Sequence, residues 1–227
     1  MLKQKPKAFL FDLNGTMIDD MQYHTEAWHK VLNDELGASL SLEEVKGHMY
    51  GKNSELLGRI FGEDRFSAEE AEKISIEKEK RYQQQFRPHL RLIAGLEGFL
   101  EDARQQKLAM AIGSAAITFN IDFVLDGLGI RHYFGAIVSA DHVDKSKPDP
   151  ETFAKGAALL GVEPAACLVF EDAPKGVEAA QKAGMPCMVL TTMHSKEEFS
   201  GYDNILGFIK DYSETSVADI LALYQKN

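Results

Sequence analysis

The chain has 227 residues, of which 44% are hydrophobic and 26% charged, a composition typical of a globular protein with one or two domains. Its 35 acidic residues outnumber 25 basic ones, for a formal net charge of −10, which argues against a nucleic-acid partner because such proteins concentrate Lys and Arg on one face. A small anionic substrate remains compatible with this charge if a few cations and a metal are focused in a cleft.

The sequence indicates neither a membrane-spanning segment nor an oxidising compartment. The basic stretch 1–7 is followed by a short apolar segment that stops at Asp12, so we expect neither a signal peptide nor a membrane span. Cys167 and Cys187 both lie in apolar runs and are expected to be small buried hydrophobes, with no disulfide. We therefore expect a cytoplasmic protein, with a monomer as the default.

The first predicted element is a buried parallel strand at 8–11, whose apolar residues run directly into Asp12. Such a strand delivers Asp12 to a loop at its carboxyl end, which is where open α/β sheets bind their ligands. An Asp that only caps a turn would give the same pattern. The functional interpretation gains support because later strand ends offer Ser114, Lys147 and the acidic pair 171–172.

From residue 20 to about residue 86, the sequence pattern predicts helices only. The predicted helices are 21–36, a helix after the capping box at Ser41, 53–61, and a long helix to about residue 85 after the capping box at Ser67. The charged run 69–81 in the last helix is expected to be a solvated helix face.

From residue 92 onward helices and strands alternate, which indicates a parallel sheet with helices on both faces. The predicted strands are 108–112, 134–139, 167–170, 187–190 and about 208–209, and the predicted helices are 95–106, 118–128, 150–160, 174–183 and 216–224. We therefore predict an α/β fold: a Rossmann-like three-layer core formed by 1–18 and 90–227, with 19–89 as an inserted α-helical cap. The crossings near 17–21 and 87–93 would be hinges.

Two strand exits carry groups suited to phosphate. Gly113 and Ser114 can bring a hydroxyl and backbone N–H groups close to a phosphate oxygen, although an ordinary strand exit has the same composition. Lys147 is followed by Pro148, and a second proline opens the next helix, so its ammonium is presented rigidly. A solvated loop lysine is the alternative.

The exit of another strand carries the adjacent carboxylates Glu171 and Asp172. Neighbouring carboxylates at a buried edge raise one another's pKa unless a cation is near. With Asp12 at a parallel strand end, Mg²⁺ is the natural partner, since it prefers a few carboxylates together with waters and substrate phosphate. Asp172 could also cap the helix that opens at Pro174, which is compatible with metal binding.

Together these motifs resemble the haloacid dehalogenase superfamily of aspartate-nucleophile phosphotransferases, most closely its β-phosphoglucomutase-like subgroup. The segment Phe11-Asp12-Leu13-Asn14-Gly15-Thr16 looks like the family's D-x-D-G-T signature. Residues 113–114, 146–150 and 170–180 match its three later motifs, and the helical insertion occupies the place of the subgroup's cap, with 23–28 similar to the first cap helix.

The resemblance implies a two-step transfer in which Asp12 attacks a phosphoryl group and water then hydrolyses the aspartyl-phosphate. It implies Mg²⁺ as cofactor and a small phosphorylated metabolite as substrate. The implied metal ligands are Asp12, the backbone carbonyl of Asn14, and Asp172, with Glu171 assisting through water. The implied phosphate or substrate contacts are Thr16, Gly113, Ser114, Ala115 and Lys147, together with Lys52, for which a solvated turn lysine is the favoured alternative.

The sequence departs from the family at Asn14, where the phosphatases carry an aspartate that protonates the leaving oxygen and activates water. An amide can do neither, and proton transfer of this kind contributes roughly 10²–10⁴-fold to a rate. Three explanations stay open: substrates with good leaving groups, proton supply by His24 or Glu171, or a phosphate-binding protein with little turnover. His24 could equally be a packing residue beside Trp28.

We therefore predict a Mg²⁺-dependent phosphatase or phosphotransferase whose acid–base catalysis is weakened or specialised by Asn14. A sugar phosphomutase and a non-catalytic phosphate-binding protein are the alternatives. A dehalogenase ranks lower, because Ser114, Lys147 and the pair 171–172 suit a metal and a phosphate better than a halide.

Overall fold

The computed structural model describes residues 4–224, so residues 1–3 of the basic N-terminal stretch and the last three residues lie outside the described residues. The chain divides into two compact units. The core unit comprises Met1–Asp19 and Arg91–Asn227, and the helical unit is Asp20–Leu90. Both boundaries fall within the crossings that the sequence predicts. None of the helices in the described part of the chain is long and apolar enough to span a membrane.

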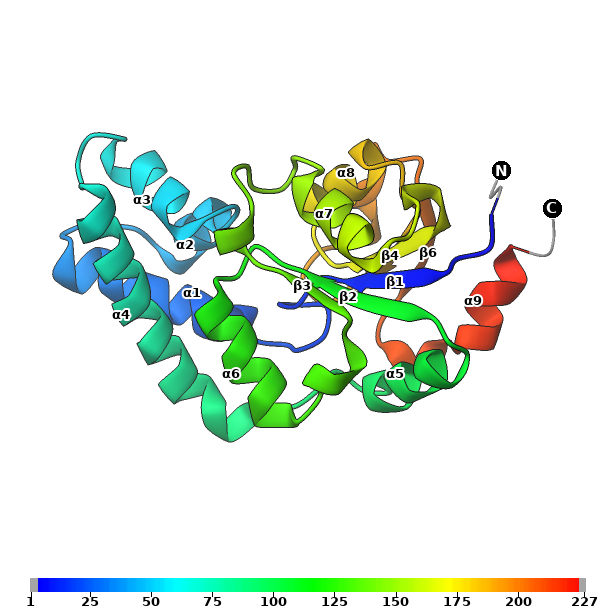
Figure 1. The fold of residues 1–227 in the computed structure, drawn as a ribbon. Helices are drawn as coiled ribbons and strands as arrows, with labels where there is room; N and C mark the ends of the chain where they lie inside the picture. The colour runs from blue at the N-terminus through cyan, green and yellow to red at the C-terminus, as the bar shows by residue number, and fades with distance from the viewer. Residues whose placement is uncertain (1–3, 225–227) are drawn as a thin grey trace. The chain divides into compact units, whose positions relative to one another are not determined.

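The core unit contains a six-stranded sheet with the order β3-β2-β1-β4-β5-β6, in which every neighbouring pair is parallel (Figure 1). The strands are β1 (Ala8–Phe11), β2 (Ala109–Gly113), β3 (Ala136–Val138), β4 (Cys167–Glu171), β5 (Cys187–Leu190) and β6 (Ile205–Ile209). The predicted α/β, Rossmann-like fold is confirmed. β3 is shorter than predicted because Ser139 already caps the next turn, where its hydroxyl accepts the N–H of Asp141.

Helices cover both faces of this sheet. They are α5 (Leu96–Gln105), α6 (Thr118–Leu128), α7 (Glu151–Leu160), α8 (Pro174–Lys182) and α9 (Val217–Leu223). Figure 1 shows α7 and α8 on one face and α5 and α9 on the other. Successive side chains of β1 point to opposite faces of the sheet. Leu10 belongs to the same apolar cluster as Phe153 of α7, whereas Phe11 stacks on Phe170 at a ring-centroid distance of 4.8 Å.

The register of the central strands determines what meets at the carboxyl edge of the sheet. Phe11 pairs with Ile112 of β2 and with Phe170 of β4. The next residues of the three strands, Asp12, Gly113 and Glu171, therefore lie at one level. Three segments that are far apart in the sequence thus reach the same edge, as expected for the ligand-binding side of an open α/β sheet.

The helical unit consists of α1 (Met21–Lys30), α2 (Leu42–His48), α3 (Asn53–Phe61) and α4 (Ala68–Phe86). Both predicted capping boxes are present, at Ser41 and Ser67. The predicted first helix does not stay α-helical to residue 36: Val31–Glu35 form a wider π-helical segment in which Leu36 N–H donates to the carbonyl of Val31. The core of this unit is apolar and is built from Trp28, Val31, Leu32, Val45, Leu56, Leu57 and Ala71.

The two cysteines are buried free thiols on β4 and β5, which confirms that they act as small core residues. Burial raises the pKa of Cys167 to about 11, and it raises that of Cys187 as well. Neither is therefore a thiolate at neutral pH, and neither has the features of a reactive cysteine.

Candidate active site

The carboxylate of Asp12 is buried at the end of β1 and is held by a lysine from a distant loop. Lys147 Nζ donates to Asp12 Oδ1 at 2.6 Å and to Glu171 Oε1 at 2.8 Å. Burial alone would lower the pKa of Lys147, but the charges of Asp12 and Glu171 outweigh it and raise that pKa above its ordinary value. Lys147 is therefore a buried ammonium, and the alternative of a solvated loop lysine is wrong.

The segment that carries Lys147 is fixed by a carboxylate. Both oxygens of Glu151 accept the backbone N–H of Asp144, at 3.1 and 3.0 Å, and one of them also accepts the N–H of Lys145 at 3.0 Å. These backbone hydrogen bonds lower the pKa of Glu151, which keeps the carboxylate ionised as an acceptor. The peptide bond between Lys147 and Pro148 is cis. The first residue of α7 thus ties down the loop before it.

Glu171 has hydrogen-bond partners besides Lys147. Its Oε2 accepts the backbone N–H groups of Asp172 and Ala173, both at 2.7 Å. The fit is close, since a Cβ added at Gly176 would lie 1.6 Å from Glu171 Oε1. Glycine at position 176 is therefore required for the carboxylate to occupy this place.

Asp172 is the third buried carboxylate, and it faces the loop that follows Asp12. Burial, together with the charges of Glu171 and Asp12, raises the pKa of Asp172 well above its usual range. The hydroxyl of Thr16 donates to Asp172 Oδ1 at 3.3 Å. Gly15 has a φ of +77°, and a Cβ there would lie 2.1 Å from Asp172 Oδ2, so the backbone of the signature loop packs directly on this carboxylate.

The end of β2 brings Gly113 and Ser114 to the same edge of the sheet. Ser114 is buried; its backbone N–H donates to the carbonyl of Val138, and its Oγ accepts the N–H of Ala116 at 3.1 Å. The serine hydroxyl can still donate its own proton, because both of these contacts leave that proton unused. Ala115 lies half-buried in the turn that follows.

Comparison with known proteins agrees with this constellation. A family model described as a haloacid dehalogenase-like hydrolase matches residues 6–184, which include the three strand ends that carry Asp12, Ser114 and Glu171. The chain belongs to the haloacid dehalogenase-like hydrolase family. The resemblance found in its motifs is thereby confirmed.

Relatives of this haloacid dehalogenase-like hydrolase include both mutases and phosphatases. The β-phosphoglucomutase of Bacillus subtilis is 32% identical over 79% of this chain and 80% of its own length. The fructose-1-phosphate phosphatase YqaB of Escherichia coli is 30% identical over 78% of this chain and 93% of its own. A crystal structure of β-phosphoglucomutase from Clostridium difficile has a TM-score of 0.84 at 26% identity and covers 97% of this chain and 98% of that one.

The donor chemistry of this hydrolase's site fits a hard divalent cation. Asp12 and Glu171 share the ammonium of Lys147, and Asp172 is a third buried carboxylate, whose pKa is raised by its burial and by the charges of Glu171 and Asp12. Within residues 4–224, no three His, Cys, Asp or Glu side chains converge as a metal site by themselves. A site made of two carboxylates and a backbone carbonyl, completed by waters and substrate, is what Mg²⁺ favours.

Two of the predicted residues, Lys52 and His24, lie in the helical unit. Lys52 precedes α3, and its backbone N–H donates to Glu55 Oε2 at 2.9 Å. His24 is buried on α1, where its ring stacks on that of Tyr82 at a centroid distance of 3.7 Å. The alternative of a packing role agrees with this burial, but the aromatic ring that stacks on His24 is that of Tyr82.

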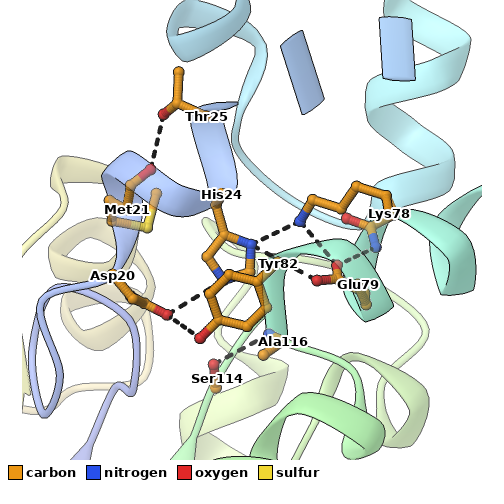
Figure 2. Close-up of polar contacts among 10 residues, drawn as sticks. Asp20, Met21, His24, Thr25, Lys78, Glu79, Tyr82, Ser114 and Ala116 are labelled. Carbon is orange, nitrogen blue, oxygen red and sulfur yellow. Dashed lines mark hydrogen bonds and ion pairs between the residues drawn. The ribbon is translucent and has the colours of Figure 1, made fainter. Parts of the chain in front are cut away.

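A cluster of buried polar side chains surrounds His24 and was not predicted from the sequence. We define the His24 cluster as Asp20, His24, Lys78, Glu79 and Tyr82 (Figure 2). The expectation of a solvated face for the run 69–81 is wrong for Lys78 and Glu79, which are 1% and 2% exposed. The helical spacing of these positions could have indicated their burial, because the buried residues of α4 form one stripe along the helix. They are Ala71, Ser75, Lys78, Glu79, Tyr82, Gln83 and Phe86.

Proposed function

We propose that this hydrolase is a Mg²⁺-dependent phosphatase or phosphotransferase of small phosphorylated metabolites, with Asp12 as the nucleophile. The observation that carries the proposal is the placement of Asp12, buried at the carboxyl end of a central strand and bonded through Oδ1 to the ammonium of Lys147. The mutase and phosphatase names of the relatives point to phosphorylated sugars as the substrate class.

The proposed reaction has two halves. First, a carboxylate oxygen of Asp12 attacks phosphorus while the bond from phosphorus to the leaving oxygen breaks, which gives an aspartyl-phosphate. Water then attacks the same phosphorus, the bond to the Asp12 oxygen breaks, and phosphate leaves with the carboxylate restored. The leaving oxygen takes up one proton in the first half, and the attacking water gives up one in the second.

The side chains and backbone groups around Asp12 have distinct roles in this scheme. Lys147 orients Asp12 and offsets charge on the phosphoryl oxygens, while Ser114 and its neighbours Gly113 and Ala115 donate hydrogen bonds to them. Asp12, Asp172 and the backbone carbonyl of Asn14 would hold Mg²⁺, which when bound neutralises charge between the carboxylates and the phosphoryl group. Glu171 supports this site indirectly, through Lys147 and through the N–H groups of the next two residues.

Asn14 is the position at which this hydrolase is specialised. Its amide cannot donate or accept the proton that each half of the reaction requires. A sugar alkoxide should therefore leave slowly from such an enzyme. The leaving groups of aryl phosphates, acyl phosphates and pyrophosphate need little protonation.

The test is a panel of sugar phosphates, aryl phosphates, acyl phosphates and pyrophosphate, assayed with Mg²⁺ and with chelator. We expect metal-dependent release of phosphate that Asp12→Ala abolishes. The matched control is Asp203→Ala, since Asp203 is exposed and precedes β6 at the opposite edge of the sheet. Phosphate binding without turnover of any substrate would favour a binding protein, and metal-free release of chloride from a 2-haloacid would favour a dehalogenase.

A further inference from the structure

A threonine beyond the end of β5 reaches back to the signature loop that follows Asp12. The hydroxyl of Thr192 donates to the carbonyl oxygen of Gly15 at 2.6 Å, although the two residues are 177 positions apart in the chain. A carbonyl can only accept, so the direction of this hydrogen bond is fixed. Both residues belong to the core unit, and Gly15 is buried. A buried carbonyl needs a hydrogen-bond partner, and Thr192 supplies one.

The order of the strands places Thr192 within reach of this loop. β4 lies between β1 and β5, and Val189 of β5 pairs with Glu171 of β4. Thr192 therefore lies beyond the carboxyl edge of the sheet, where its hydroxyl can reach past the end of β4. The backbone N–H of the preceding residue, Thr191, donates to the carbonyl of Ile209 at 3.0 Å, which ties the exit of β5 to the end of β6. The hydroxyl thus comes from a segment that is itself fixed to the sheet.

Gly15 is held at both of its backbone hydrogen-bonding groups. Its φ of +77° lies in the left-handed region, and a glycine can leave that region without a steric penalty. Its N–H donates to the carbonyl of Ile18 at 2.8 Å, within the same loop, while its carbonyl accepts from Thr192. Together the two hydrogen bonds restrict rotation about both backbone torsions of the most permissive residue in the loop.

The conformation of Gly15 determines where the carbonyl of the preceding residue points. The Asn14 carbonyl and the Gly15 N–H belong to one peptide group, which is planar, so the direction of one sets the direction of the other. A rotation at Gly15 would turn the peptide groups on its two sides relative to each other. Thr192 opposes this rotation because it holds the second of these groups. The orientation of the Asn14 carbonyl therefore depends on a hydroxyl from the exit of another strand.

We propose that Thr192 is a positioning residue, which holds Gly15 so that the backbone carbonyl of Asn14 is directed towards Mg²⁺. The inference rests on the proposed function, in which that carbonyl is a metal ligand. Groups that orient a ligand by hydrogen bonding typically contribute roughly 10–100-fold to metal affinity. Thr192 therefore acts on the affinity for Mg²⁺ and not on the chemical step.

The test is the affinity of the full chain for Mg²⁺, measured by isothermal titration calorimetry. Thr192→Val removes the hydroxyl and keeps a branched side chain of similar shape, and we expect it to raise the Kd for Mg²⁺ roughly tenfold. Thr192→Ser keeps the hydroxyl and should have a Kd close to that of the wild type. In a phosphate assay, Thr192→Val should need more Mg²⁺ for half-maximal activity, with little change in kcat at saturating Mg²⁺.

The neighbouring threonine provides the matched control. Thr191 Oγ1 lies 3.5 Å from the carbonyl of Ile209, which is long for a hydrogen bond, so Thr191→Val should leave the Kd for Mg²⁺ unchanged. A second readout needs no metal: amide hydrogen exchange at Gly15 should be faster in Thr192→Val than in the wild type, and unchanged in Thr191→Val. If the added methyl group of valine prevents folding, Thr192→Ala leaves space in its place and is expected to show the same two effects.

An unchanged Kd for Mg²⁺ in the folded variant that lacks the hydroxyl would overturn the proposal, because the hydroxyl would then only satisfy a buried carbonyl. A Kd raised equally by Thr192→Ser, or faster exchange throughout the chain, would also contradict it. These results would leave the proposed function intact if the wild type binds Mg²⁺. A wild type that binds no Mg²⁺ would remove both the proposed function and the role of Thr192 towards the metal.

Discussion

Lys147 Nζ lies 2.6 Å from Asp12 Oδ1 although the two residues are 135 positions apart in the chain. The same ammonium bonds Glu171 at 2.8 Å, so one cation holds carboxylates from two neighbouring strands. Breaking a buried ion pair by removing one partner typically costs about 3–5 kcal/mol, because a charge is left uncompensated. Loss of Lys147 is therefore expected to destabilise the fold.

Lys147→Met should lower the free energy of unfolding by about 3–5 kcal/mol and abolish phosphate release. The physical reason is that Asp12 and Glu171 would be left buried without their shared cation. Urea denaturation and a phosphate assay give the two readouts. Lys145→Met, at an exposed position of the same loop, should change neither by much, and a stable, active Lys147→Met would contradict the role assigned to Lys147.

The raised pKa of Lys147 predicts a pH dependence of stability. The folded state holds this proton more tightly than the unfolded chain, so the contribution is complete below the ordinary pKa of 10.5. It is lost as the pH rises above that value towards the raised pKa. We expect the free energy of unfolding, measured by denaturant titration, to fall more steeply above about pH 10.5 in the wild type than in Lys147→Met. Parallel profiles would show that the ion pair does not couple to folding.

Asp172→Asn should stabilise the metal-free protein and remove its response to Mg²⁺. The substitution removes a charge whose burial and repulsion by Glu171 and Asp12 raise the pKa of Asp172, and it also removes a proposed ligand. At a Mg²⁺ concentration of about 100 times the Kd, ligand linkage should stabilise the wild type by about 2.7 kcal/mol and the variant by almost nothing. Thermal melts with Mg²⁺ and with chelator measure both effects, with Asp203→Asn as control.

Asn14→Asp should restore proton transfer selectively. For a sugar phosphate, whose alkoxide needs a proton, we expect kcat to rise by roughly 10²-fold or more. For an aryl phosphate the gain should be small, because its leaving group departs without help. Steady-state kinetics on the two substrates provide the comparison, and equal gains would show that leaving-group protonation is not what Asn14 limits.

Gly176→Ala should impair the site through packing alone. The new Cβ would occupy the position of the Glu171 carboxylate, 1.6 Å from Oε1, and would push that carboxylate off Lys147 and the two N–H groups. We expect both a lower midpoint in urea and a loss of activity. Gly98 on α5 has no atom within 4 Å of an added Cβ, so Gly98→Ala should instead stabilise by about 0.5–1 kcal/mol. Equal behaviour of the two variants would contradict the packing argument.

Much of the secondary structure was predictable because its signals are local. The apolar run 8–11 and the capping boxes at Ser41 and Ser67 each depend on a few neighbouring residues, and the elements form where these signals predict them. The end of the first helix was not predictable in this way. Apolar periodicity continues to Leu36, but the hydrogen-bond pattern changes to the π type from Val31, and periodicity does not distinguish the two.

The sequence by itself determined which side chains lie at the ends of strands. A buried parallel strand is recognised by its apolar run, and the residue that follows the run lies at the strand's end. Asp12, Ser114 and the pair 171–172 were found in this way. Only the tertiary structure decided which of these groups touch: strand register sets Asp12 level with Glu171, and the long loop brings Lys147 between them. It alone also decided that Lys78 and Glu79 are buried, since a charged residue on a helix enters the interior only where distant partners such as His24 satisfy it.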